Sequence, residues 1–147
     1  MKAHYLDSSA WIKRYFREDG SEGIASLFAE DAALTCSRLA IVEVIAGVVR
    51  RARHEGISEP LIQTQVGKIR HDATGIALIE LSPPIMSAAE DMAARHGLRG
   101  SDAVHLASAI SYRAGHSDDE LVLVSSDLEL LAAARKEGLT VLDPQRP

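Results

Sequence analysis

The sequence has few of the residues that would place it in an oxidising, zinc-binding or membrane setting. It contains one cysteine, Cys36, which excludes an intrachain disulfide and a cysteine-rich zinc site. Cys36 lies in the apolar stretch AALTC, where we expect a small buried side chain. No apolar stretch reaches membrane-spanning length, and no basic-then-apolar leader opens the chain. We therefore expect a cytoplasmic protein.

Positive charge is also scarce. The chain has 16 Lys and Arg residues against 21 Asp and Glu residues, a net charge of −5. Such a chain is no general nucleic-acid binder, because counterion release requires clustered Lys and Arg. Any role with RNA or DNA must therefore depend on local basic patches and on bound cations. The length of 147 residues fits a single domain, residues 1–147, with a proper hydrophobic core.

Strand-like and helix-like segments alternate along the chain. The patterns predict strands at 2–7, 32–37, 75–81, 120–126 and 139–143. They predict helices at 8–17, 21–31, 38–54, 58–72, 82–97, 102–115 and 127–138. Near-continuous apolar strands between helices are typical of a parallel sheet covered on both faces. The predicted fold class is α/β, an α/β/α sandwich with a mostly parallel central sheet of about four to five strands.

Four lone acids lie in otherwise apolar surroundings. Asp7 ends the first strand, Glu43 is the only charge in LAIVEVIAGVV, Asp102 opens SDAVHLASAI, and Asp127 follows LVLVSS. A single ionised carboxylate is costly to bury, so such acids usually have a partner, a metal or a shifted pKa. Ligands collect at the carboxyl ends of parallel strands, where Asp7 and Asp127 fall. If the four converge, they form an oxygen-lined pocket suited to a hard divalent cation.

Helix capping offers a second interpretation for three of these acids. Asp7 can cap the first helix, where Ser8 and Ser9 are other possible caps. Asp102 follows Ser101, a possible cap, at a position where an acid complements the helix dipole. In the same way, Ser126 and Glu129 fit a capping box around Asp127.

Neither capping nor solvation explains Glu43. Its neighbours on the same helix face include the small residues Ala46 and Gly47, at spacings of three and four. These small residues would let the helix approach the sheet closely, so that Glu43 points inward.

Four segments together resemble a known family. The segments YLDSSAWIK, RLAIVEVIAGVVRR, LRGSDAVHLASAI and LVSSDLELLAAARKEGLTVL are similar to the motif regions of PIN-domain ribonucleases, above all the VapC-type toxins of toxin–antitoxin pairs. The resemblance covers nearly the whole chain, and the stretch from Gly56 to Ser82 is the least informative. The first motif is weak alone, whereas SDAVHLASAI followed by a strand and SSD is specific.

The resemblance implies both an activity and a site. It implies a divalent-metal-dependent endoribonuclease that uses Mg²⁺ or Mn²⁺, forms a homodimer and is neutralised by a cognate antitoxin. The acidic metal site would consist of Asp7, Glu43, Asp102 and Asp127, with Ser9 and Ser125 as supporting hydroxyls. Threonine is commoner in the family at the second hydroxyl position.

Several other residues are candidates for contacts with RNA or with partners. Lys13, Arg14 and Arg17 follow the first motif and can track an RNA backbone. The cluster Arg50–Arg53 fits the same role or a solvated helix end. His105 lies one helical turn after Asp102, where a packed or interface role is more usual than catalysis. Apolar residues of the early helices suggest a dimer surface, namely Trp11, Tyr15, Leu61 and Ile62.

Two further readings compete with a metal-dependent nuclease. A phosphotransfer receiver domain also places acids at strand ends and binds Mg²⁺. It requires paired acids after the first strand, a phosphorylatable Asp on a middle strand and a Lys near the last strand, and this set is missing from the sequence. A catalytically silent PIN-like interaction module stays open, although the presence of all four acids argues against it.

Overall fold

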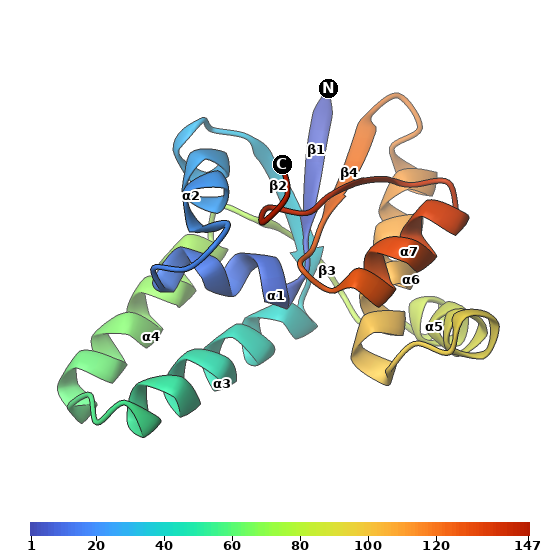
Figure 1. Cartoon of the computed structure of the whole chain (residues 1–147). Coiled ribbons are helices and arrows are strands. Elements are labelled where there is room, and N and C mark those ends of the chain that lie inside the picture. Colours follow the sequence, from blue (N-terminus) through green and yellow to red (C-terminus); the bar gives the residue numbers. More distant parts are fainter.

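The computed structural model describes residues 1–147 and has a five-stranded, all-parallel sheet at its centre. Its strand order is β3-β2-β1-β4-β5, so β1 and β4 are neighbours in the middle (Figure 1). The strands are β1 Lys2–Leu6, β2 Ala33–Ser37, β3 Ala77–Ile79, β4 Glu120–Val124 and β5 Thr140–Leu142. The α/β/α sandwich predicted from the sequence is confirmed.

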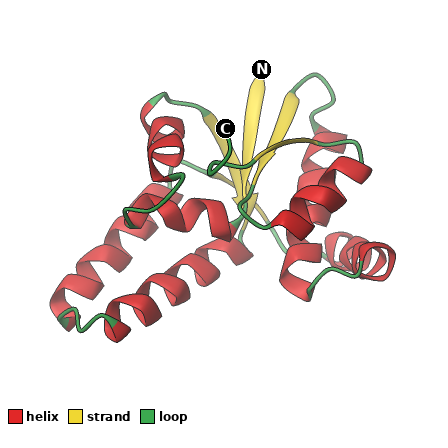
Figure 2. Ribbon diagram, viewed as in Figure 1, coloured by secondary structure: helices red, strands yellow, loops and turns green.

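Helices cover both faces of this sheet (Figure 2). One layer contains α1 Ser8–Trp11, the 3₁₀ helix η1 Ile12–Tyr15, α2 Ser21–Ala29, α3 Leu39–His54 and α4 Glu59–Ala73. The other layer contains α5 Pro83–His96, α6 Gly100–Gly115 and α7 Leu128–Lys136. The helices α3 and α4 project together away from the sheet (Figure 1). None of the helices is both long and apolar enough to cross a membrane.

The strands alternate between two hydrophobic cores. On β4, Leu123 packs into the core beneath α5, α6 and α7, whereas Val122 and Val124 pack into the core beneath α1 to α4. On β1, Tyr5 belongs to the first of these cores and Leu6 to the second. Burial on both faces explains why the strands are apolar runs instead of alternating patterns. It also directs Tyr5 toward α6.

The pairing of β1 with β4 positions the start of two helices. The register runs from Lys2 opposite Glu120 to Leu6 opposite Val124, and the Asp7 amide then donates to the Val124 carbonyl over 3.2 Å. Asp7 and the residues after Val124 therefore lie side by side at the carboxyl end of the sheet, which we call the carboxyl rim. Because α1 follows β1 and α7 follows β4, both helices begin there.

The structure confirms Asp7 as a helix cap and corrects the serines that were predicted as caps. Ser8 and Ser9 lie inside α1, and Asp7 is its cap, accepting from the Ala10 amide. Asp127, not Ser126, caps α7 by accepting from the amides of Glu129 and Leu130. The helix α6 begins at Gly100, two residues earlier than predicted, so Ser101 lies inside it and Arg99 occupies the cap position without a capping bond. In α1 and α7 the carboxylate itself reaches the free amides of the first turn.

Several elements are shorter than predicted. The segment 8–17 divides into α1 and η1 and is helical only to Tyr15, and the strand predicted at 75–81 is Ala77–Ile79. Gly47 allows a close approach of α3, but to η1 instead of the sheet, because a Cβ atom on Gly47 would lie 2.7 Å from Ile12 Cδ1. Cys36 is buried, as predicted, and burial raises the pKa of its thiol to about 12.

The proposed apolar dimer surface is partly wrong. Trp11 and Ile62 are core residues with almost no exposed surface, and Tyr15 is half-buried. Of the four, only Leu61 is well exposed, at 62%. Exposed apolar surface is found instead at Val42 on α3, which is 64% exposed.

Candidate active site at the carboxyl rim

Asp7 is the most buried acid of the rim, with 2% of its surface exposed. Its Oδ1 accepts from the Ala10 amide at 2.9 Å, and its Oδ2 accepts from the Ser125 hydroxyl at 2.8 Å. The Ser9 hydroxyl lies within 3.0 Å of both oxygens. A buried carboxylate is tolerated when hydrogen bonds of this kind satisfy it. The fold thus fixes the direction of Asp7 with groups from β1, α1 and the end of β4.

The two hydroxyls also connect the strands to each other. Ser9 Oγ accepts from the Ser126 amide at 3.1 Å, and Ser125 Oγ accepts from the Asp127 amide at 3.0 Å. Each hydroxyl therefore donates to Asp7 and accepts from the backbone of the β4–α7 turn. This arrangement holds Asp7 beside Asp127.

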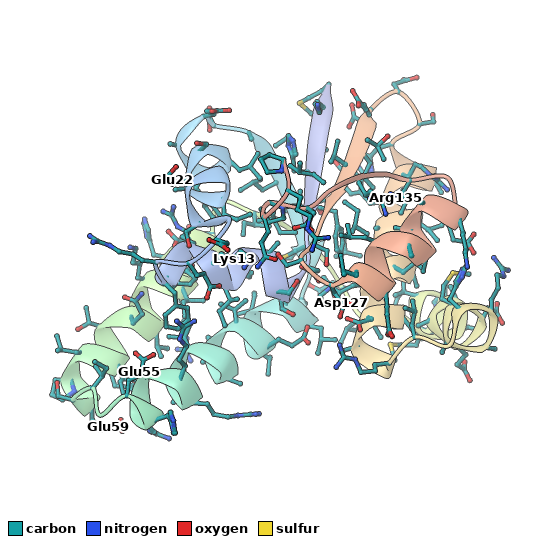
Figure 3. The ribbon with its side chains drawn as sticks, in the orientation of Figure 1. Lys13, Glu22, Glu55, Glu59, Asp127 and Arg135 are labelled. Carbon is teal, nitrogen blue, oxygen red and sulfur yellow. The ribbon has the colours of Figure 1, made fainter.

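Asp102 and Asp127 share one cation, the guanidinium of Arg99. Its Nη2 donates to Asp127 Oδ2 at 2.9 Å, and its Nε lies 3.4 Å from Asp102 Oδ2. Asp102 is 8% exposed and lies in the first turn of α6. Asp127 is half-buried at the start of α7, where Figure 3 shows it at the base of the helix.

Glu43 reaches the rim from α3, in the opposite helix layer, as its apolar surroundings predicted. Its Oε1 lies 2.6 Å from His105 Nε2, and Nδ1 of the same ring lies 2.8 Å from the Tyr5 hydroxyl. The Ser37 amide donates to that hydroxyl at 3.2 Å. The hydroxyl hydrogen of Tyr5 is therefore free to point to Nδ1, which then acts as an acceptor. A neutral His105 ring accordingly carries its own hydrogen on Nε2 and donates it to Glu43. The packed interpretation of His105 is confirmed, and the ring orients Glu43.

The electrostatics of the rim favour an added cation. Burial raises the pKa of Asp7 above its ordinary value, opposed by the nearby imidazole of His105 and by the donors that surround the carboxylate. Burial also raises the pKa of Asp102, and the neighbouring charge of Asp127 raises it further, opposed by Arg99. Negative charge at these positions is therefore incompletely compensated by the protein.

The residues present fit a hard divalent ion. Asp102 Oδ2 is buried with no hydrogen-bond donor, and the candidate ligands are all carboxylate oxygens, the donors that Mg²⁺ and Mn²⁺ prefer. With Arg99 between Asp102 and Asp127, no three acidic or imidazole groups lie in a metal-binding arrangement. An ion at the rim would therefore require side-chain movement, and the residues that would hold it are Asp7, Glu43, Asp102 and Asp127.

The basic residues after the first motif have structural partners. Lys13 is buried and pairs with Glu18 at 3.3 Å, whereas Arg14 pairs with Asp72 at 2.8 Å and lies over the ring of Phe28. Binding RNA through either side chain would break these pairs. Only Arg17 of the three is exposed.

Sequence reasoning missed Tyr5 and Arg99 as parts of the site. Tyr5 lies two residues before Asp7 and therefore faces the same side of β1, a period-two relation that is readable in the sequence. Arg99 lies three residues before Asp102, within reach of its carboxylate. That spacing is a weak signal, because such pairs are common on helix surfaces.

Residues 4–136 match the family described as PIN domain. The chain is 32% identical to Ribonuclease VapC45 of Mycobacterium tuberculosis over 141 residues, covering 96% of this chain and 95% of that protein.

Solved structures with the same fold include two proteins at low sequence identity. A toxin-antitoxin complex from Klebsiella pneumoniae is 18% identical with a TM-score of 0.69, covering 98% of this chain and 99% of that one. FitAcB from Neisseria gonorrhoeae is 16% identical with a TM-score of 0.68, covering 96% and 97%.

The raised pKa of Asp7 predicts a pH-dependent stability. The folded state holds this proton more tightly than the unfolded chain, so the folding stability contributed at this position falls as pH rises above about 4. The variant Asp7→Asn lacks this ionisation. We therefore expect the free energy of unfolding of Asp7→Asn, minus that of wild type, to increase from pH 4 to pH 7 in metal-free buffer. Urea denaturation measures both values.

The exposed acid Asp91 on α5 supplies the control, since Asp91→Asn should follow wild type across the same range. A difference between Asp7→Asn and wild type that is constant with pH would contradict the assignment.

The variant Tyr5→Phe tests the orientation of Glu43 by His105. It removes the donor to His105 Nδ1 and leaves the buried Ser37 amide without its acceptor, which costs about 1–3 kcal/mol in unfolding free energy. Nitrogen NMR of the His105 ring should show hydrogen on Nε2 in wild type and a changed tautomer signal in the variant. Tyr112→Phe, whose ring stacks on His116, is the control. Unchanged His105 signals in Tyr5→Phe would contradict the proposed orientation of His105 by Tyr5.

Proposed function

Because the chain belongs to the PIN-domain family, we propose that it is a divalent-metal-dependent endoribonuclease, the toxin of a toxin–antitoxin pair. The relative from M. tuberculosis, named a ribonuclease, supports the reaction class. The single observation that carries the proposal is the gathering of buried carboxylates at the rim, with Asp102 Oδ2 lacking a donor. We further propose that residues 1–147 form one PIN domain that acts in the cytoplasm.

The chain's own residues have distinct tasks in this proposal. Asp7, fixed by Ser9, Ser125 and the Ala10 amide, is the rigid ligand of the site. Asp102 and Asp127 supply oxygens from the starts of two helices, whose dipoles favour anionic groups there. When bound, Mg²⁺ or Mn²⁺ supplies an activated water and neutralises charge on the phosphate.

Glu43 has a different environment from the three aspartates. His105 binds only its Oε1, so Oε2 is free for an ion or for the proton of an attacking water. Its side chain is 27% exposed, which gives water access to this oxygen. We propose that Glu43 is the most adaptable of the four acids in the reaction.

The first test is cleavage of single-stranded or loop RNA. Cleavage should require Mg²⁺ or Mn²⁺ and stop with excess EDTA, because the acids alone cannot activate water. Asp102→Asn should lower the cleavage rate by roughly 100-fold or more, which corresponds to several kcal/mol of lost charge stabilisation. The exposed acid Asp91, changed to Asn, is the matched control. Undiminished cleavage in EDTA would refute metal dependence, and no cleavage under any metal would favour a silent PIN module.

We also propose a homodimer and an antitoxin partner. The fold neighbour from K. pneumoniae is a toxin-antitoxin complex, which supports the partner class. Two apolar surfaces suit these roles. One is an exposed strip along α3, lined by Val42, Ile45, Ala46 and Val49, and we call it the α3 strip. The other is a groove between the ends of α3 and α4, lined by residues that include Phe16, Val48, Ile57 and Leu61.

The shapes of the α3 strip and of the groove suit different partners. The α3 strip lies along one helix face next to Glu43, and such a face can meet its own copy across a two-fold axis. The groove is concave and apolar, a shape that accepts a peptide segment from another chain. We propose that two copies associate through the α3 strip. An antitoxin segment then occupies the groove, and a further part of it crosses the acidic rim.

Two matched variants test this division, since Val42 and Leu61 are similarly exposed. By light scattering at tens of micromolar, wild type should have the mass of a dimer and Val42→Glu that of a monomer, because a charge at the α3 strip opposes burial. Leu61→Glu should stay dimeric and lose affinity for the antitoxin encoded beside the gene. A monomeric wild type, or dimer loss in Leu61→Glu alone, would contradict the proposal.

A further inference from the structure

One cation of the chain itself lies between two of the proposed metal ligands. Arg99 Nη2 is 2.9 Å from Asp127 Oδ2, and Arg99 Nε is 3.4 Å from Asp102 Oδ2. The two carboxylates lie at the starts of different helices, α7 and α6, and neither forms another ion pair. The guanidinium therefore supplies the only positive charge that these two acids share.

The contact with Asp102 is incomplete. Its Oδ2 is buried and accepts no hydrogen bond, because the approach of Arg99 Nε is an ion pair without hydrogen-bond geometry. A guanidinium is planar and presents its donors in a fixed fork, so it cannot satisfy two carboxylates that converge from separate helices as a spherical ion can. The two acids thus hold a cation that satisfies them incompletely.

The Arg99 side chain can leave this position without a change in the fold. This side chain is 75% exposed, and the residue stands at the cap position before α6, where its carbonyl accepts from the Ala103 amide at 3.0 Å and its side chain makes no capping bond. On its amino-terminal side, buried Leu98 anchors the chain. Rotation of the Arg99 side chain into solvent therefore requires no movement of α6 or of the core. The loss of an exposed ion pair costs little compared with the desolvation of a buried one.

We propose that Arg99 is an internal counter-ion that stands in the divalent-metal site and must be displaced when the metal binds. This inference rests on the proposed function in one respect, that Asp102 and Asp127 are metal ligands. Arg99 offsets the repulsion of the two carboxylates in the metal-free protein. The apparent metal affinity is then the intrinsic affinity multiplied by the fraction of molecules in which Arg99 does not occupy the site.

This competition has a calculable size. If Arg99 bridges the acids in nine-tenths of metal-free molecules, only a tenth are ready to bind, and the apparent Kd rises about tenfold. Removal of the guanidinium should therefore tighten metal binding and, without metal, leave the two acids to repel each other. If Arg99 had only a structural role, its removal would lower the stability of the protein without raising its affinity for the metal.

The test is calorimetric titration of the metal-free protein with Mn²⁺. Arg99→Ala should bind Mn²⁺ about tenfold more tightly than wild type, and Arg99→Lys should fall between them, because a lysine bridges two acids less well. The melting temperature of Arg99→Ala should be lower without metal and rise further on Mn²⁺ addition. Arg53→Ala is the control, since Arg53 is also exposed and is paired with Glu59, the first residue of α4, far from Asp127 (Figure 3).

A second readout follows Arg99 directly. In wild type, the NMR signal of its Nε–H should shift on addition of Mg²⁺ as the side chain leaves the acids, while that of Arg53 stays in place. Equal or weaker Mn²⁺ binding by Arg99→Ala would overturn the inference and leave the metal site intact. If neither wild type nor Arg99→Ala binds Mn²⁺, the metal site fails together with the inference. Binding by Arg99→Ala alone would support strong competition.

Discussion

The buried carboxylate of Asp7 is the constraint on which the rest of the rim depends. A charge with 2% exposure costs several kcal/mol in desolvation unless the fold supplies donors. Here the donors are the Ala10 amide and the hydroxyls of Ser9 and Ser125. They are in place only because β1 pairs with β4 in one register, which sets Ser125 beside Asp7. A slip of one residue would leave the charge buried without these bonds.

From this fixed point the other acids acquire their positions. The turn after β4 is held by Ser9 and Ser125, and it places Asp127 at the start of α7. The same side of β1 presents Tyr5 to His105, which in turn meets Glu43 from the opposite layer. Gly47 lets α3 approach Ile12 closely. The acids therefore come from four helices or helix starts, and their combined negative charge exceeds what the protein compensates.

Much of this arrangement is readable in the sequence, since apolar strands alternating with helices predict a parallel sheet and strand ends predict the places of Asp7 and Asp127. Glu43 was identifiable as a charge with no structural explanation. The sequence correctly offered Asp7 as a helix cap, but at α7 it assigned the cap to Ser126, where the neighbouring Asp127 performs this task. Capping acids and site acids are the same residues here, so the two interpretations did not exclude each other.

Other features depend on three-dimensional proximity that no local pattern encodes. Lys13 reads as a solvent-exposed base, yet it is buried against Glu18. Trp11 and Ile62 read as interface residues, yet both side chains are buried, and Trp11 belongs to the core beneath α1 to α4. The bridge from Arg99 to Asp127 spans 28 residues and joins two helices whose separation is set by the whole fold. Long side chains of this kind are assigned only once the backbone is known.

The central claim is that the rim is a cation site filled by the chain's own arginine until a metal replaces it. The most direct measurement is a crystal structure of the protein soaked with Mn²⁺, with anomalous diffraction recorded to locate the ion. The account predicts an anomalous peak among the carboxylates of Asp7, Asp102 and Asp127, with the Arg99 side chain turned away from them. A peak elsewhere on the surface, with Arg99 still bridging Asp102 and Asp127, would contradict it.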